Sequence, residues 1–276
     1  MTAIIQRGLE MIRKCFTVNP NRTKEEIASY EEMLSSGVYQ GVEIFYPYRK
    51  KIEDIKTYQE AIMSYLKYNP EMVCHLPYGV DGNLATYQNL EQALMWIKDA
   101  IKFASLFGVK KATLHPGFCD GTLDRSDAIR LCAQNIKALC QYAKGFNIII
   151  MLENLIGEQE LMRTPEEYFE LKALVGEDNL KMIFDVAHFH ASKFCQQTQD
   201  ILDFVEQVKD DLYHLHISDN DGTRDMHAAI GVGIIDFKAY FKKLKEVGYE
   251  GLYSSEVLFN SPADLLSTAQ SMDQQL

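Results

Sequence analysis

The chain has 276 residues, 47% of them hydrophobic, which is enough to bury a large core as one α/β barrel or as two modest domains. Its 39 acidic residues outnumber its 28 basic ones, and the formal charge of −11 excludes a broad basic surface for nucleic acid or an anionic membrane, although not a local basic groove. No apolar run has the length of a membrane span, the N-terminal MTAIIQRGLEMIRK lacks the apolar core of a signal peptide, and no Pro- or Ser/Gly-rich linker occurs. We therefore expect a single cytoplasmic domain over residues 1–276.

The six cysteines lie far apart and form no CxxC pair. Several stand in apolar patterns such as IRLCAQNIKALC. Buried free thiols in a reducing compartment fit this distribution best.

Eight short runs rich in β-branched and aromatic residues recur along the chain, and we predict them to be strands. They are IRKCFTV (12–18), GVEIFY (41–46), EMVCHL (71–76), KKATLH (110–115), NIIIMLE (147–153), LKMIFD (180–185), DLYHLHI (211–217) and GLYSSEV (251–257). Segments with helical periodicity lie between them, for example 90–108, 127–146 and 237–248, and tend to end at a glycine: Gly108, Gly145 and Gly248. A strand and a helix repeated eight times predict an α/β fold with one (β/α)8 TIM barrel. A doubly wound open sheet is the alternative, but it usually has fewer strands or a glycine-rich first turn, and no GxGxxG or GxxxxGK[ST] motif occurs.

Two segments carry further helix signals. Thr164 is followed by Pro165 and, three residues on, by Glu167, which predicts a capping box with proline at the first helical position. The last residues, SPADLLSTAQSMDQQL, are predicted to form an amphipathic helix that covers the barrel, with Leu265 and Leu266 on its buried side.

Histidine and carboxylate side chains gather at the predicted strand ends, where a TIM barrel builds its active site. Seven histidines lie on or after the strands and none in a predicted helix, and four acidic residues stand at or near the ends of strands 2, 5, 6 and 8. The histidines are His75, His115, His188, His190, His214, His216 and His227, and the acidic residues are Glu43, Glu153, Asp185 and Glu256. A carboxylate that ends an apolar strand is costly to desolvate unless it is paired or bound to a metal. Together they predict a rim that binds zinc, manganese or a similar divalent ion.

Some of these histidines also have a structural interpretation. His75 or His115 taken alone is more often a hydrogen-bonded rim histidine than a metal ligand. His190 and His214 each alternate with another histidine along the chain, so we expect at least one member of each pair to point away from the site. We interpret His190 and His214 as supporting residues.

The acidic residues differ in the same way. Glu43 equally suits a salt bridge with a neighbouring lysine or arginine, and Asp219 and Asp221 are typical turn residues in SDNDG. The stronger candidates are two pairs that fall just past buried strands, Asp185 with His188 and Asp225 with His227.

The pieces GVEIF, HLPYGVDGNLA, LHPGF, MLENL, FDVAHFHA, HISDNDGTRDMHAAIGVGIIDF and YSSEV occur in this order over nearly the whole chain. By their order and spacing the chain resembles the xylose isomerase-like barrel superfamily, which holds sugar isomerases and epimerases together with the endonuclease IV type of AP endonuclease. In the epimerase branch the resemblance implies one divalent metal, held by Glu153, Asp185, His216 and Glu256. The same two glutamates would exchange a proton with the carbon next to the substrate carbonyl, one on each face.

The resemblance also implies substrate contacts. His188, three residues after Asp185, matches the histidine that holds the substrate in the family, and Arg224 matches its arginine more loosely. We add His75 and Glu43 to this set. The expected cofactor is a divalent ion, zinc or manganese first and magnesium or cobalt as alternatives. The expected substrate is a small sugar or sugar phosphate, because no legible phosphate-binding motif decides between them.

The same resemblance supports an alternative activity. The endonuclease IV branch uses nine ligands for three zinc ions, and this sequence fills every one: the four above and, as additional ligands, His75, His115, His188, Asp225 and His227. Such a cluster would activate water and cleave a phosphodiester. Against it, the opening IRKCFTVNPNRTKEEI lacks the glycine-rich start of that branch's DNA-gripping loop, and no cluster of Arg and Lys with aromatic residues replaces it. Nucleic acid is therefore the less favoured partner.

The stretch HISDNDGTRDMH (216–227) concentrates both alternatives. We assign His216 to the main metal and Arg224 to the substrate, and Asp225 with His227 either to a second metal site or to sugar hydroxyls. A barrel that only binds ligand is a third class, which is less favoured because a complete charged rim would then be an unexplained stability cost. Association into a homo-oligomer is compatible with the family.

Overall fold

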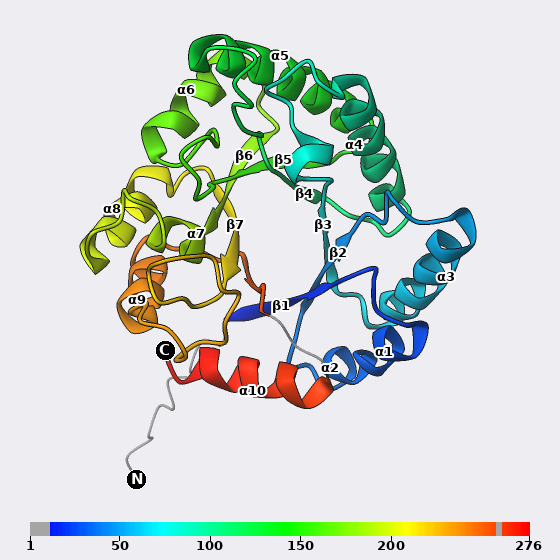
Figure 1. The fold of residues 1–276 in the computed structure, drawn as a ribbon. Coiled ribbons are helices and arrows are strands. Elements are labelled where there is room, and N and C mark those ends of the chain that lie inside the picture. The colour runs from blue at the N-terminus through cyan, green and yellow to red at the C-terminus, as the bar shows by residue number, and fades with distance from the viewer. Residues whose placement is uncertain (1–11, 258–260) are drawn as a thin grey trace.

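Eight parallel strands close into a barrel in the computed structural model of the protein, which describes residues 12–257 and 261–276 (Figure 1). The strands pair in chain order and the ring closes between the first and the last. They are β1 (Arg13–Val18), β2 (Gly41–Phe45), β3 (Glu71–His75), β4 (Lys111–Leu114), β5 (Ile149–Glu153), β6 (Leu180–Asp185), β7 (Leu212–Ile217) and β8 (Leu252–Ser255). The predicted TIM barrel is confirmed, and each predicted strand is present to within a few residues.

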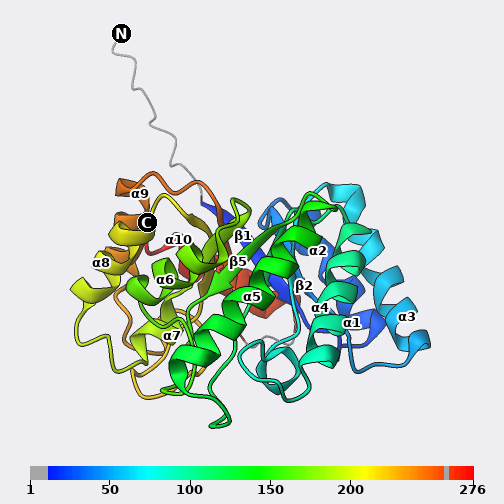
Figure 2. The same ribbon diagram turned by 90° about the horizontal axis from the view of Figure 1, so that it is seen from above.

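The helices form an outer ring around the strands, as Figures 1 and 2 show. They are α1 (Lys24–Ser29), α2 (Glu31–Ser35), α3 (Ile52–Met63), α4 (Leu90–Ser105), α5 (Arg125–Lys144), α6 (Pro165–Val175), α7 (Val186–His190), α8 (Thr198–Val208), α9 (Phe237–Glu246) and α10 (Pro262–Asp273), with short 3-10 helices η1 (Ser64–Tyr68) and η2 (Gly79–Gly82). None of the helices in the described ranges has the length and apolarity that crossing a membrane requires.

The strands are apolar on both faces because one face meets the helices and the other fills the barrel. Inside the barrel, five fully buried side chains pack together: Cys15, Val73, Met151, Ile183 and Leu252. Three of them stand two positions before a predicted site residue on the same strand. Since strand side chains alternate in direction, this apolar plug and the polar rim share the inner face.

The two helix predictions are confirmed with one change. Thr164 caps α6 and accepts a hydrogen bond from the Glu167 amide, with Pro165 at the first position, but the Glu167 carboxylate accepts from the Arg163 amide at 2.6 Å instead of closing the capping box. In α10, Leu265 is fully buried and its carbonyl accepts from the Tyr39 hydroxyl. All six cysteines are free thiols, and four of them are buried.

Candidate metal centre at the barrel mouth

Four side chains from neighbouring strands converge at the mouth of the barrel. Each offers one ligand atom, and the four atoms lie within 4.8 Å of one another: Glu153 at the end of β5, Asp185 at the end of β6, His216 in β7 and Glu256 directly after β8. His216 Nδ1 is 3.1 Å from Glu153 Oε1 and 3.0 Å from Glu256 Oε2. The structure thus brings together the four residues that the sequence assigned to one metal.

The donor set fits a divalent cation. Glu153, Asp185 and His216 are fully buried, and the Glu256 side chain is 15% exposed. One carboxylate oxygen of each acid, namely Glu153 Oε2, Asp185 Oδ2 and Glu256 Oε2, is buried and has histidine rings nearby but no well-aligned hydrogen bond from a described residue. Three desolvated carboxylates around one imidazole are costly without a cation, and this mixture of ligands suits zinc or manganese.

The pKa shifts of these four residues also indicate that the group favours a positive charge. Burial alone would lower the pKa of His216, but the carboxylates, Glu256 foremost, raise it well above its usual value. Burial would raise the pKa of Glu153, yet the His216 and His115 rings lower it well below its usual value. Burial raises the pKa of Asp185 to about 7, and the negative charges of Glu256 and Glu153 act in the same direction. The negative charge of the carboxylates therefore favours the protonated form of His216, as it would favour a bound cation.

A second group of ligand atoms adjoins the first. His75 Nε2 and His115 Nε2 lie 3.5 and 3.0 Å from Glu153 Oε2, and these three residues also offer ligand atoms within 4.8 Å of one another. His75 donates from Nδ1 to the Leu76 carbonyl, and the Phe45 ring stacks on it at 4.6 Å between centroids. Its Nε2 is thereby fixed toward the site.

The loop after β7 contributes a third group. His227 Nε2 is 2.9 Å and His188 Nε2 is 3.5 Å from Asp225 Oδ2. His227 donates from Nδ1 to the Glu256 carbonyl at 2.9 Å, and the bond to Asp225 raises its pKa to about 9. All nine residues of the alternative three-metal set thus lie at one mouth.

His188 and His190 depart from the prediction that no histidine lies in a helix, because both lie in the short helix α7. The Asp185 carboxylate caps this helix by accepting from the His188 amide at 2.8 Å, which turns the His188 ring toward the site. His188 also donates from Nδ1 to the Asn154 carbonyl at 3.0 Å. His190 is hydrogen-bonded to Asn220 instead and has the supporting position that was expected.

His214 and Glu43 occupy positions that the sequence interpretation did not foresee. Residues two apart in a strand point to the same face, so His214 lies inside the barrel with His216, not outside it. The expectation that one of these two points away was wrong. Glu43 is fully buried and hydrogen-bonded to both histidines, so it faces the barrel interior rather than the open mouth where a substrate would lie.

Arg224 is exposed in the loop after β7, and the described residues give it no hydrogen bond or ion pair with the metal-site residues. The structure therefore does not bring it together with them. Asp219, expected to be a turn residue, is buried, and its carboxylate accepts from the backbone amides of Asn220, Gly231, Gly233 and Ile235. It ties together the two ends of the loop that carries Asp225 and His227.

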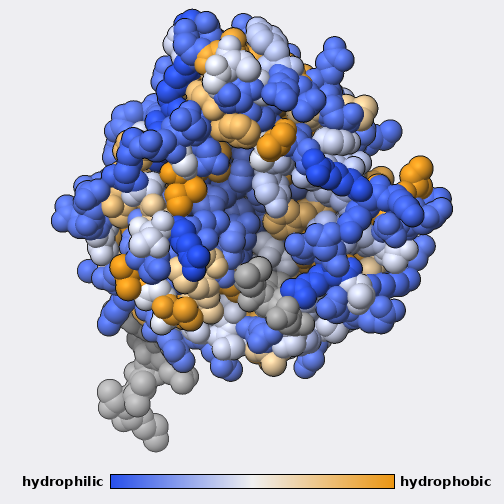
Figure 3. Space-filling view, viewed as in Figure 1, coloured by the Kyte–Doolittle hydropathy of each residue, from blue (hydrophilic) through white to orange (hydrophobic). Residues whose placement is uncertain are grey.

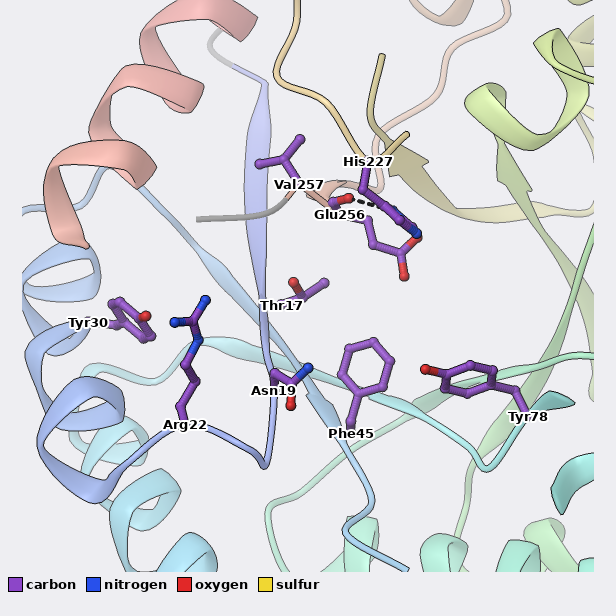
Figure 4. A pocket seen from close by; sticks show the side chains of 9 residues that line it. All are labelled: Thr17, Asn19, Arg22, Tyr30, Phe45, Tyr78, His227, Glu256 and Val257. Carbon is purple, nitrogen blue, oxygen red and sulfur yellow. Dashed lines mark hydrogen bonds between the residues drawn. The ribbon is translucent and has the colours of Figure 1, made fainter. Parts of the chain in front are cut away.

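A pocket of about 240 Å³ opens beside Glu256 and His227. Figure 3 shows a hollow with hydrophilic residues in the middle of this face, and Figure 4 shows the rings of Phe45 and Tyr78 on one side of the pocket and Arg22 with Tyr30 on the other. Thr17, Asn19 and Val257 complete the lining. Sequence reasoning missed the residues from β1 and the segment after it, because nothing in their spacing distinguishes them from other loop residues.

The fold is a TIM barrel, and its polar side chains gather at the C-terminal ends of the strands, where TIM-barrel enzymes build their active sites. Residues 31–274 match the family described as xylose isomerase-like TIM barrel. The chain therefore belongs to this family.

The similar proteins include an uncharacterized protein, a sugar epimerase and a probable endonuclease. A Methanocaldococcus jannaschii protein of uncharacterized function is 29% identical over 198 residues, which cover 69% of this chain and 65% of that protein. Fructoselysine 3-epimerase from Escherichia coli O157:H7 is 27% identical over 127 residues, 46% of this chain and 44% of the enzyme. A probable endonuclease 4 from Pediococcus pentosaceus is 25% identical over 202 residues, 69% of this chain and 67% of that protein.

Solved structures show the same architecture. A D-tagatose 3-epimerase-like protein superposes with a TM-score of 0.71 over 94% of this chain and 98% of its own, at 23% sequence identity. At this identity the likeness concerns the fold.

Proposed function

We propose that the protein is a divalent-metal-dependent isomerase or epimerase that acts on a small sugar or sugar phosphate by proton transfer next to a carbonyl. The observation that carries the proposal is the position of Glu153 and Glu256, which meet in one cation-fitting group while Glu256 also lines the open pocket. The similarity to fructoselysine 3-epimerase supports it. The pocket volume, about 240 Å³, suits a small molecule.

Glu153, Asp185, His216 and Glu256 would hold the ion, with zinc or manganese favoured over magnesium or cobalt. When bound, the ion supplies Lewis acidity that polarises the substrate carbonyl and stabilises the negative charge formed beside it. The two glutamates do the proton chemistry in this proposal. One glutamate, in its ionised form, would accept the proton of the carbon next to the carbonyl, while the other, in its protonated form, would face the opposite side of that carbon.

Delivery of the other glutamate's proton to the opposite face would invert that carbon. Return of a proton to the former carbonyl carbon, with transfer of the hydroxyl proton to the former carbonyl oxygen, would instead move the carbonyl. His188 and His75 line the same mouth with their Nε2 atoms fixed inward, so they suit contacts with substrate hydroxyls. The buried position of Glu43 and the exposed position of Arg224 favour neither as a substrate contact.

Turnover of a panel of free and phosphorylated ketoses, with metal content measured by elemental analysis, tests the proposal. Glu153→Gln and Glu256→Gln are expected to abolish turnover while part of the metal is retained. Glu250→Gln, an exposed glutamate in the turn before β8, is the matched control and is expected to keep wild-type activity. Full activity in both site variants would disprove the assignment.

A second candidate is a zinc-dependent phosphodiesterase of the endonuclease IV type. It is favoured by the additional ligand groups at His75 with His115 and at Asp225 with His227, and by the similarity to the probable endonuclease 4. It predicts two or three zinc ions per chain and cleavage of abasic-site DNA that Asp225→Asn abolishes. About one metal per chain, with no binding or cleavage of such DNA at low salt, would count against it.

A further inference from the structure

Glu43 in β2 sits inside the barrel directly beneath the proposed metal group. Its Oε2 accepts from His216 Nε2 at 3.0 Å, from His214 Nε2 at 3.2 Å and from Ser254 Oγ at 2.8 Å. Its Oε1 accepts from Thr113 Oγ1 at 3.0 Å. Four donors from β4, β7 and β8 thus surround one carboxylate that has no exposed surface.

The partners of Glu43 argue against a metal ligand. Glu43, His214 and His216 do place ligand atoms within 4.8 Å of one another, but both carboxylate oxygens are already used by hydroxyl and imidazole donors. The hydroxyls of Thr113 and Ser254 would have to give up their bonds for an ion to approach. The group is therefore better described as a closed hydrogen-bond network.

The orientation of His216 shows what this network does. His75, His188 and His227 each donate from Nδ1 to a backbone carbonyl and turn Nε2 toward the mouth. His216 is reversed: its Nε2 meets Glu43, and its Nδ1 faces Glu153 and Glu256. An imidazole binds a metal only through a nitrogen without a proton, and the hydrogen bond on the other nitrogen decides which one that is.

We propose that Glu43 is a positioning residue for the metal centre: by accepting the Nε2 proton of His216, it holds the ring in place and leaves Nδ1 as the metal-binding atom. This inference rests on the proposed function, because it assigns Glu43 a part in building that centre. His214 and Ser254 hold Oε2 of the carboxylate where His216 needs it, whereas Thr113 bonds only the other oxygen, Oε1. A carboxylate behind a ligating histidine also makes the ring a stronger donor.

The test is the affinity for zinc, measured on the full chain by competition with a chromophoric chelator. Glu43→Ala removes the acceptor and is expected to weaken zinc binding about 10- to 100-fold. Glu43→Gln keeps one carbonyl oxygen for the three donors that meet Oε2 and is expected to weaken zinc binding by a smaller factor. Should Glu43→Ala fail to fold, Glu43→Gln still gives the comparison.

Thr113→Val is the matched control, because it removes a hydrogen bond to Glu43 in the same buried layer without touching His216. It is expected to lower the melting temperature and leave the zinc affinity nearly unchanged. Long-range proton–nitrogen spectra of the zinc-loaded protein supply a second readout. We expect a protonated, slowly exchanging Nε2 on His216 in the wild type and in Thr113→Val, and its loss in Glu43→Ala.

The outcomes separate the inference from the function on which it rests. Wild-type zinc affinity in both Glu43 variants, or equal losses in these variants and in Thr113→Val, would overturn the positioning role while leaving the metal centre intact. A wild-type protein that binds no divalent ion would overturn both.

Discussion

Replacing Asp219 with asparagine should loosen the loop that carries Asp225 and His227. The carboxylate of Asp219 accepts from the Asn220 and Ile235 amides through Oδ1, at 2.9 and 3.2 Å, and from the Gly231 and Gly233 amides through Oδ2, at 2.9 and 3.0 Å. Asparagine offers one oxygen and one amide group in the same volume. In either orientation, two backbone amides therefore lose their acceptor and face another donor.

The expected loss follows from these two bonds. A hydrogen bond to a charged group contributes about 1.5–3 kcal/mol, so two of them give about 3–6 kcal/mol. Because the loop can relax toward solvent, we expect the lower end, about 3 kcal/mol. Much of this loss should appear as local opening of the loop.

Two measurements check this value: urea unfolding, and hydrogen exchange at the amides of Gly231, Gly233 and Ile235. Asp221→Asn is the matched control, because Asp221 is exposed and, within the described part of the chain, accepts only from the Thr223 amide and hydroxyl. It is expected to lower the free energy of unfolding much less than Asp219→Asn does. If both variants lost the same stability and protected these amides equally, the role of Asp219 as the organiser of the loop would be refuted.

Three further predictions concern packing, pH and metal. Gly233→Ala would place a Cβ atom 2.1 Å from the Asn220 carbonyl oxygen, so it should lower the thermal midpoint by several degrees, whereas an unchanged midpoint would contradict the packing. Burial alone would raise the pKa of Asp211, but hydrogen bonds from two lysines lower it. The ionised Asp211 carboxylate therefore stabilises the folded protein fully above the unfolded pKa of about 4, and this stabilisation is lost as the pH falls through the folded pKa. Asp211→Asn should therefore lower the free energy of urea unfolding by roughly 1–2 kcal/mol at pH 7 and by less as the pH falls below about 4, and a pH-independent cost would disagree. Zinc at about 100 times its Kd should stabilise the wild type by about 2.7 kcal/mol. At the same zinc concentration, calorimetry of Asp185→Asn should show most of this gain lost. An equal gain in this variant would remove Asp185 from the ligand set.

The barrel was predictable because its strands are apolar runs of the right length at regular spacing, and because a charged residue ending such a run is unusual. That reasoning placed Glu153, Asp185 and His216 together at the mouth, as the structure does. The assignment of strand faces failed at His214, where the two-residue spacing from His216 was taken as alternation although it means a shared face.

Other features depend on tertiary contacts that a local pattern does not contain. The helix α7 is a single turn, too short for a periodic signal, and it forms where Asp185 caps it. Asp219 looks like a turn residue because its four donors come from residues up to 16 positions further on. The interior partners of Glu43 come from three other strands, so their meeting required the closed barrel.

Deuterium exchange tests the central claim most directly. The zinc- or manganese-loaded protein would be incubated in D2O with a panel of ketopentoses, ketohexoses and their phosphates, and mass spectrometry would detect deuterium on the carbon next to the carbonyl. Proton transfer by Glu153 and Glu256 predicts incorporation of one deuterium into at least one sugar by the wild type, and none by Glu153→Gln or Glu256→Gln. No incorporation into any sugar by the wild type, together with cleavage of abasic-site DNA, would contradict the account and establish the phosphodiesterase in its place.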